Sequence, residues 1–210
     1  MRTFIKAVAL AAVVLFASAS QNAYAALSTS KTVNVSSEAP RQILMVTKLF
    51  KNTVTAANDI TAGNIFNYGT LQLNASGNLV SSTGGSTGVA SGIALISVSN
   101  NSLAWKLEQT GTAPTSGANT LPAGACTVVP VYAAADNGGV ANDGTLGTAG
   151  TWVATNKALF TSNANGKMRV IQAHYSITDD PAAGATSFVS QDQKDGVYTN
   201  TVVFTATSLV

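Results

Sequence analysis

The chain has 210 residues, of which 46% are hydrophobic and only 10% are charged, with one histidine and one cysteine. Ordinary globular proteins carry about 25% charged residues. The apolar content excludes a disordered chain, and a lone cysteine, Cys126, excludes both an intramolecular disulfide and a cysteine-based zinc site. A catalytic triad would have to use His174. The abundance of Ala, Thr, Ser, Asn, Gly and Val fits an extracellular β protein better than a cytosolic enzyme.

The first 25 residues are expected to be a secretory signal peptide. Arg2 and Lys6 precede an apolar run over 7–17, and Ala23 and Ala25 supply the small residues before the expected cut. The run is too short for a membrane-spanning helix, which needs about 20 residues. The product is therefore expected to leave the cytoplasm.

Removal of residues 1–25 changes the charge balance. The full chain carries 11 Lys and Arg against 9 Asp and Glu, and the leader removes two positive charges and no negative ones. A neutral mature chain gives no electrostatic basis for binding nucleic acid. It also places little long-range repulsion between copies, which favours self-association.

Directly after the expected cut, the chain reads as an alternating strand. Successive side chains of a strand point to opposite faces, which places five residues of this stretch on one side: Leu27, Thr29, Lys31, Val33 and Val35. Such a strand at a free terminus is compatible both with an ordinary first strand and with a strand that pairs outside its own domain.

The rest of the chain also reads as β-structure. Short apolar runs are separated by clusters of Gly, Asn, Asp and Ser, and no window has sustained helical spacing. The expected strands lie at 42–50, 69–73, 93–98, 103–108, 127–132, 168–177 and 197–207. This pattern predicts one all-β domain, a two-layer antiparallel β-sandwich over 37–210.

The polar stretches between the strands are expected to be surface loops. The glycine-rich segments 81–92 and 136–150 lack the following helix and lysine of a phosphate-binding loop. Pro130 removes a hydrogen-bond donor from its strand, which predicts an edge or bulged position.

Residues that could carry chemistry are few, and no catalytic, metal or cofactor site is expected. A lone His174 in mid-strand is a weak triad candidate. Asp179 and Asp180 precede Pro181, which favours a turn over a Ca²⁺ site. A second set of oxygen ligands has no recognised calcium pattern: Asp136, Asn137, Asn142 and Asp143.

Cys126 opens an apolar strand, so we expect a buried thiol rather than a link between molecules. Three sequons begin at Asn34, Asn74 and Asn100. They matter only in a host with that glycosylation machinery, and the leader looks bacterial.

The C-terminal end completes the pattern. A turn at Asp195-Gly196 leads into a β-rich segment that includes Tyr198, Val202 and Phe204. The ending Gly-Val-Tyr-Thr-Asn-Thr-Val resembles that of the subunits of chaperone–usher pili. Further likeness lies in Ile65-Phe66-Asn67-Tyr68-Gly69, in Trp105-Lys106-Leu107 and in Lys194-Asp195 before the turn. The chain resembles the major pilins of the common pilus, in the alternate chaperone–usher class.

The resemblance implies an incomplete immunoglobulin-like sandwich that lacks its last strand, although the Cys pair bracketing a Trp that is typical of antibody domains is absent. In this family the N-terminal extension of the next subunit fills the gap, a process called donor-strand complementation. By this likeness residues 26–36 would be the donor strand, with Leu27, Thr29, Lys31, Val33 and Val35 entering the neighbour. The partners would be identical subunits in a filament, a periplasmic chaperone, an outer-membrane usher and a receptor on a host surface.

The likeness therefore predicts a structural subunit of a surface pilus, without enzymatic activity, that supports adhesion and biofilm formation. An alternative is a secreted β-sandwich adhesin or carbohydrate-binding module. Such a module would need converging exposed aromatics, for which the chain offers Trp105, Trp152, Tyr132 and Tyr175. A secreted hydrolase is a third and more remote alternative.

Overall fold

The computed structural model describes residues 42–63, 68, 70–81, 92–100, 103–133, 144–163 and 168–209, all within one compact unit, Pro40–Val210. The expected signal peptide and the expected donor strand with Leu27, Thr29, Lys31, Val33 and Val35 lie outside these residues. So do all four residues considered as a second set of oxygen ligands: Asp136, Asn137, Asn142 and Asp143.

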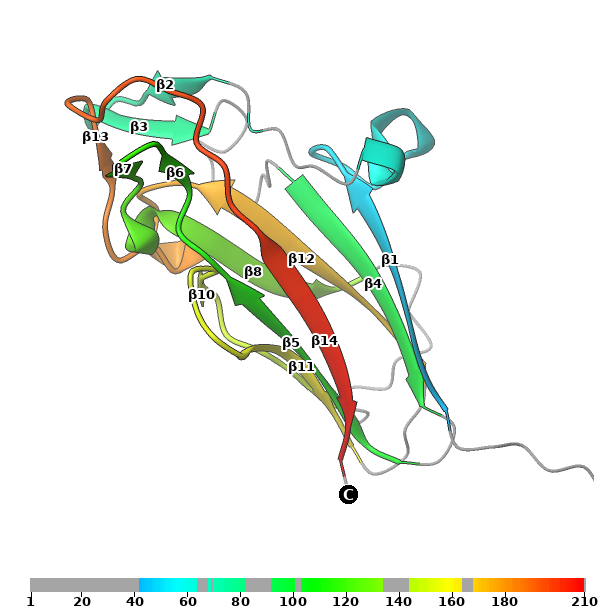
Figure 1. The fold of residues 1–210 in the computed structure, drawn as a ribbon. Helices are drawn as coiled ribbons and strands as arrows, with labels where there is room; N and C mark the ends of the chain where they lie inside the picture. The colour runs from blue at the N-terminus through cyan, green and yellow to red at the C-terminus, as the bar shows by residue number, and fades with distance from the viewer. Residues whose placement is uncertain are drawn as a thin grey trace, which may run out of the picture. The chain divides into compact units, whose positions relative to one another are not determined.

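The described residues form antiparallel sheets and no α-helix, which confirms the all-β prediction (Figure 1). The first large sheet has the strand order β1-β4-β12-β8-β10. Its strands are β1 (Ile43–Phe50), β4 (Gly92–Asn100), β12 (Arg169–Ile177), β8 (Cys126–Tyr132) and β10 (Gly150–Thr151). We call it sheet A.

The second large sheet, sheet C, has the order β14-β5-β11-β9. Its strands are β14 (Val202–Ser208), β5 (Trp105–Gly111), β11 (Lys157–Ser162) and β9 (Gly144–Leu146). β1 and β14 are the outermost strands of their sheets, and they contact each other on one side of the sandwich.

Smaller elements complete the unit. A three-stranded sheet has the order β13-β3-β2, with β13 (Val189–Ser190), β3 (Asn78–Ser81) and β2 (Leu71–Leu73), and a hairpin joins β6 (Thr115–Ser116) to β7 (Asn119–Thr120). Four short 3₁₀ turns are η1 (Ala56–Asn58), η2 (Thr61–Gly63), η3 (Ala123–Ala125) and η5 (Pro181–Ala183). The Ser81 hydroxyl donates to the carbonyl of Ile177 (3.2 Å) and ties the small sheet to sheet A.

The core lies between sheets A and C, because alternate side chains of each strand point to the layer between them. Trp105 and Leu107 are fully buried, while Lys106 between them is not, as their alternation predicts. Sheet A contributes Ile96, Val98, Val128, Ile171, Ala173 and Tyr175, and sheet C adds Leu159 and Phe160.

The strand predictions hold best where the alternation is regular. β1, β4, β5, β8 and β12 all lie within a few residues of the expected ranges. The last strand begins at Val202, five residues later than predicted. Tyr198 therefore lies in the preceding segment, where Thr199 makes only an isolated bridge to Thr115. The strand expected at 69–73 is shorter, beginning at Leu71.

β11 and β3 are strands that the sequence analysis missed. β11 carries an irregularity of register between Ala158 and Phe160, which places Leu159 and Phe160 both in the core and removes the period of two. β3 has only four residues and begins with Asn78.

Pro130 lies on β8 opposite Ala173 of β12. On the other side of β8, β10 pairs only with Thr127 and Val128. At Pro130, β8 is therefore the outermost described strand, as its missing amide hydrogen requires.

The buried tryptophan on β5 should dominate the stability of the core. Replacement of Trp105 by Ala is expected to lower the free energy of unfolding by about 3–5 kcal/mol, because the removed ring leaves a cavity against Phe160 (centroids 5.0 Å apart). Denaturant titration of the purified chain measures this. Thr161→Ala, on the exposed face of β11, is the control and should change stability by less than about 0.5 kcal/mol. Equal effects of the two substitutions would contradict this account of the core.

Candidate functional site

The side of the sandwich bordered by β1 and β14 is the candidate site. On β14 the burial alternates, and Val202, Phe204 and Ala206 pack against the core while remaining partly exposed. On β1, Met45 packs against the core in the same incomplete way. We call these four residues the β1–β14 side.

The β1–β14 side differs from the interior of the same sheets. Inward side chains of central strands, such as Ile96 on β4 and Ile171 on β12, have no exposed surface. Phe204 approaches the ring of buried Tyr175 edge-on (centroids 6.5 Å apart), so it belongs to the core by contact. The apolar layer between the sheets is therefore less completely covered at β14 and β1 than in its middle.

The backbone edges point to the same side. Among the described residues, β14 is paired only with β5. Within the same residues β1 is paired as a strand only with β4, but at its end Ile60 N–H donates to the Leu49 carbonyl (2.8 Å) and Phe50 bridges Asp59, so only the part of β1 before Leu49 can act as an edge. Each outermost strand directs alternate N–H and C=O groups away from its sheet, and such an edge is a template for another strand. Alternating apolar side chains with available backbone groups are the features that a β-strand from another chain can bind.

One hydrogen bond joins the two sheets at an end of the β1–β14 side. Buried Asn100, paired with Ile43 of β1, donates through Nδ2 to the Ser208 hydroxyl of β14 (2.7 Å). This places the first residues of β1 and the last residues of β14 at the same end of the sandwich.

The sequence placed Val202 and Phe204 on the last strand, and both lie on the β1–β14 side. Tyr198 lies before the strand, where its hydroxyl donates to the carbonyl of Lys194 (2.7 Å) and accepts from Gln193 Nε2 (2.7 Å). It fixes the turn that leads into β14. Met45 and Ala206 were missed as site residues, because the sequence does not reveal which strand is outermost.

His174 lies in mid-strand on the outward face of sheet A, as predicted. Its register neighbours are Ile93 and Val129, and its Nε2 lies 2.8 Å from Gln172 Oε1. Burial lowers the pKa of His174 below its ordinary value of 6.5, which leaves the ring neutral at pH 7. The environment is that of a strand histidine satisfied by a neighbour.

Cys126 is buried and free, which confirms the expected burial. Burial raises the pKa of its thiol to about 12. Since the thiolate is the reactive form, this cysteine is protected from modification in the folded chain at neutral pH.

Asp179 and Asp180 act as turn residues. Asp180 Oδ1 accepts from the N–H of Ala182 (2.9 Å) and caps η5. Asp179 Oδ2 accepts from the side-chain amides of Asn74 (2.9 Å) and Asn78 (2.8 Å), which joins the β2–β3 hairpin to the end of β12. Within the described ranges, no group of three or more His, Cys, Asp or Glu side chains is arranged to hold a metal ion.

The four aromatics considered for a glycan site do not form one. Trp105, Trp152 and Tyr175 are fully buried, and only Tyr132 of the four is exposed. The Tyr175 hydroxyl donates to Gln109, whose amide reaches the carbonyl of Trp152 (3.4 Å), and Tyr68 stacks on Trp152 (centroids 5.7 Å apart). These rings build the core, and burial raises the pKa of Tyr68 and Tyr175.

Comparison with protein-family models, with curated proteins and with solved structures gave no match. None of the helical segments among the described residues is long and apolar enough to cross a membrane.

The Asp179 contacts predict acid sensitivity. Because both amides donate to the carboxylate, the pKa of Asp179 lies below its ordinary 3.8. The ionised group therefore stabilises the fold above about pH 4, and this contribution is lost as the pH falls through the lowered pKa. We expect the denaturant concentration at the unfolding midpoint to decrease when the pH is lowered below 4. The decrease should be smaller in Asp179→Asn. Exposed Asp192→Asn is the control; the same flattening in both variants would contradict the assignment.

Proposed function

We propose that this chain is a structural subunit of a bacterial surface pilus and that it polymerises by exchange of a donor strand. The observation that supports this most is the β1–β14 side, with inward apolar side chains left partly uncovered at two strand edges. In the proposed fibre, residues 26–36 of one copy lie along the β1–β14 side of the next.

The proposed donor strand and the β1–β14 side both carry alternating apolar side chains. Leu27, Val33 and Val35 alternate with polar residues, and Val202, Phe204 and Ala206 alternate with Val203, Thr205 and Thr207 on β14. Burial of three aliphatic side chains at about 1.5–3 kcal/mol each would contribute about 5–9 kcal/mol. Backbone hydrogen bonds along the edge add to this. Such a joint separates slowly although no covalent bond forms.

Lys31 shares the face of the donor strand that would enter the neighbour. Its aliphatic stem can lie along apolar surface while the ammonium stays in water. Thr29 is short and uncharged, so it adds no further cost of burying a charge.

Export and assembly follow from the same proposal. A subunit with uncovered edges would aggregate unless it is covered on its way to the surface. A periplasmic chaperone and an outer-membrane usher would meet that need, after cleavage of the leader at residue 25. The fibre would serve attachment and biofilm formation.

The first test removes the donor. Deletion of 27–35 is expected to leave a folded subunit that forms no fibres, because the acceptor side of each copy lacks its strand. Electron microscopy of material sheared from producing cells measures fibre formation, with the unaltered chain as control. Fibres built from the shortened chain would refute the proposal.

A second test fixes which face of the donor enters the neighbour. Val33→Asp is expected to reduce fibre yield by at least about tenfold, because it would bury a carboxylate among apolar side chains. Thr32→Asp places the same charge on the opposite face and is the matched control. Equal effects in a quantitative assembly assay would show that the donor strand enters in a different register.

A further inference from the structure

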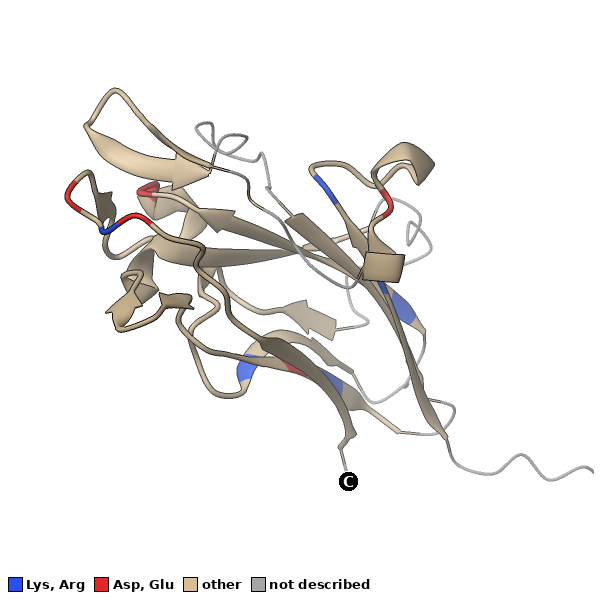
Figure 2. Cartoon of the chain, turned by 45° about the horizontal axis from the view of Figure 1, so that its top comes forward, with Lys and Arg blue, Asp and Glu red and all other residues tan. Residues whose placement is uncertain are grey.

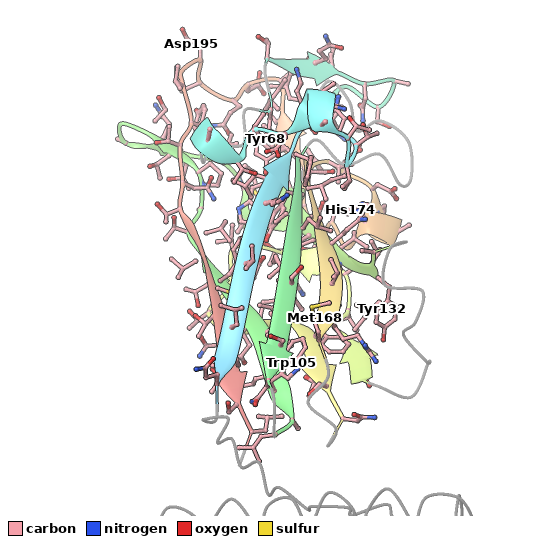
Figure 3. The ribbon with its side chains drawn as sticks, turned by 90° about the vertical axis from the view of Figure 1, so that its right-hand side faces the viewer. Tyr68, Trp105, Tyr132, Met168, His174 and Asp195 are labelled. Atoms are coloured by element: carbon pink, nitrogen blue, oxygen red, sulfur yellow. The ribbon has the colours of Figure 1, made fainter. Side chains whose placement is uncertain are left out.

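The outward face of sheet A carries exposed apolar side chains at the end where β1 begins. Leu44 pairs with Ser99 and Val46 with Ser97, while Val170 of β12 pairs with the other side of Ser97. Met168 directly precedes β12 and lies on this face (Figure 3). The exposed fractions are 60% for Leu44, 50% for Val46 and 58% for Met168. We call Leu44, Val46, Met168 and Val170 the Leu44 patch.

Ser97 and Ser99 of β4, whose side chains are small, lie between the β1 and β12 residues of the Leu44 patch. Three strands spaced about 4.8 Å apart carry it. Leu44, Val46 and Met168 therefore expose apolar surface on one face, with the two serines between them, and exposed apolar surface marks sites of association between proteins.

The outward face of sheet C is different. Lys106 Nζ and Glu108 Oε2 form an ion pair (2.8 Å) at its centre, opposite Thr207 and Thr205 of β14. Charged residues are sparse over both sheets (Figure 2), but the Leu44 patch itself contains none; Lys48 lies in the next row along β1. The exposed ion pair makes the sheet C face a poorer match for an uncharged protein surface than the Leu44 patch, although Val203 of β14 is also exposed there.

We propose that the Leu44 patch packs against a second copy of this chain, the copy that receives residues 26–36. This inference rests on the proposed function and adds a second contact to the same joint. It follows from where the described part of the chain begins. Residues 37–41 alone join the donor strand to Gln42, which stands two residues before Leu44.

The short connection limits where the second copy can lie. Six residue steps from Ser36 to Gln42 reach at most about 20 Å. A globular unit of about 170 residues has a radius of gyration near 15 Å. A body of that size, held within that distance of Gln42, lies close to the surface near the start of β1. The Leu44 patch is the apolar part of that surface.

Charge does not oppose the contact. With residues 1–25 removed, the chain has equal numbers of basic and acidic residues, so two copies do not repel each other at long range. The contact would also fix the angle between successive copies.

The test measures burial of the patch in intact fibres. Leu44→Cys and Met168→Cys are made separately in the full chain, and fibres sheared from producing cells are treated with a polar maleimide. Thr161→Cys, exposed on sheet C, is the matched control. Cys126 is buried and should stay unmodified, which confirms in each variant that the fold is intact. The unassembled reference is the same cysteine variant carrying Val33→Asp, which keeps the N-terminal segment.

We expect modification at positions 44 and 168 to be at least about tenfold slower in fibres than in the unassembled reference, and modification at 161 to be unchanged. Equal rates at 44 and 168 in both samples would overturn the contact while leaving donor-strand assembly intact. Protection already present in the unassembled chain would overturn it too, because the chain's own segment would then cover the patch. If the unaltered chain forms no fibres, the proposed function fails and this inference fails with it.

Discussion

The structure depends on how completely the apolar layer between the two sheets is covered at its sides. In the middle, Ile96, Trp105 and Tyr175 are covered from both sheets and have no exposed surface. At the edge formed by β1 and β14, Met45 and Phe204 touch the same core but remain partly exposed. A sandwich gains stability when both faces of this layer are covered and when the backbone groups of its outermost strands are paired. A strand that aligns with β14 would supply apolar side chains and backbone partners together.

The sequence predicted the fold class and the central strands because their alternation is set by burial on one side only. Trp105 and Leu107 alternate with Lys106, and five strands were placed within a few residues. Prediction failed where tertiary contacts override the pattern. The register irregularity in β11 buries both Leu159 and Phe160. β14 starts late because Thr199 pairs with Thr115, outside the regular ladder between β14 and β5.

The candidate site was predictable only in part. Val202 and Phe204 could be assigned to the last strand, but no local pattern identifies β1 and β14 as neighbours across the sandwich. That juxtaposition depends on strand order, in which β1 pairs with β4 and β14 with β5. Likewise, the aromatics that suggested a glycan site are the bulkiest members of the core. Composition alone cannot separate an aromatic binding surface from an aromatic core.

β1 links the two proposed contacts because its two faces serve different purposes. Met45 faces inward and belongs to the β1–β14 side, whereas Leu44 and Val46 face outward, on the same face as Met168. The strand also receives the connection from the proposed donor segment at Gln42. A joint that used the donor strand alone would hold two copies together but leave them free to turn. A contact on the outer face of the same strand would resist that rotation, and its apolar side chains would leave water as the joint forms.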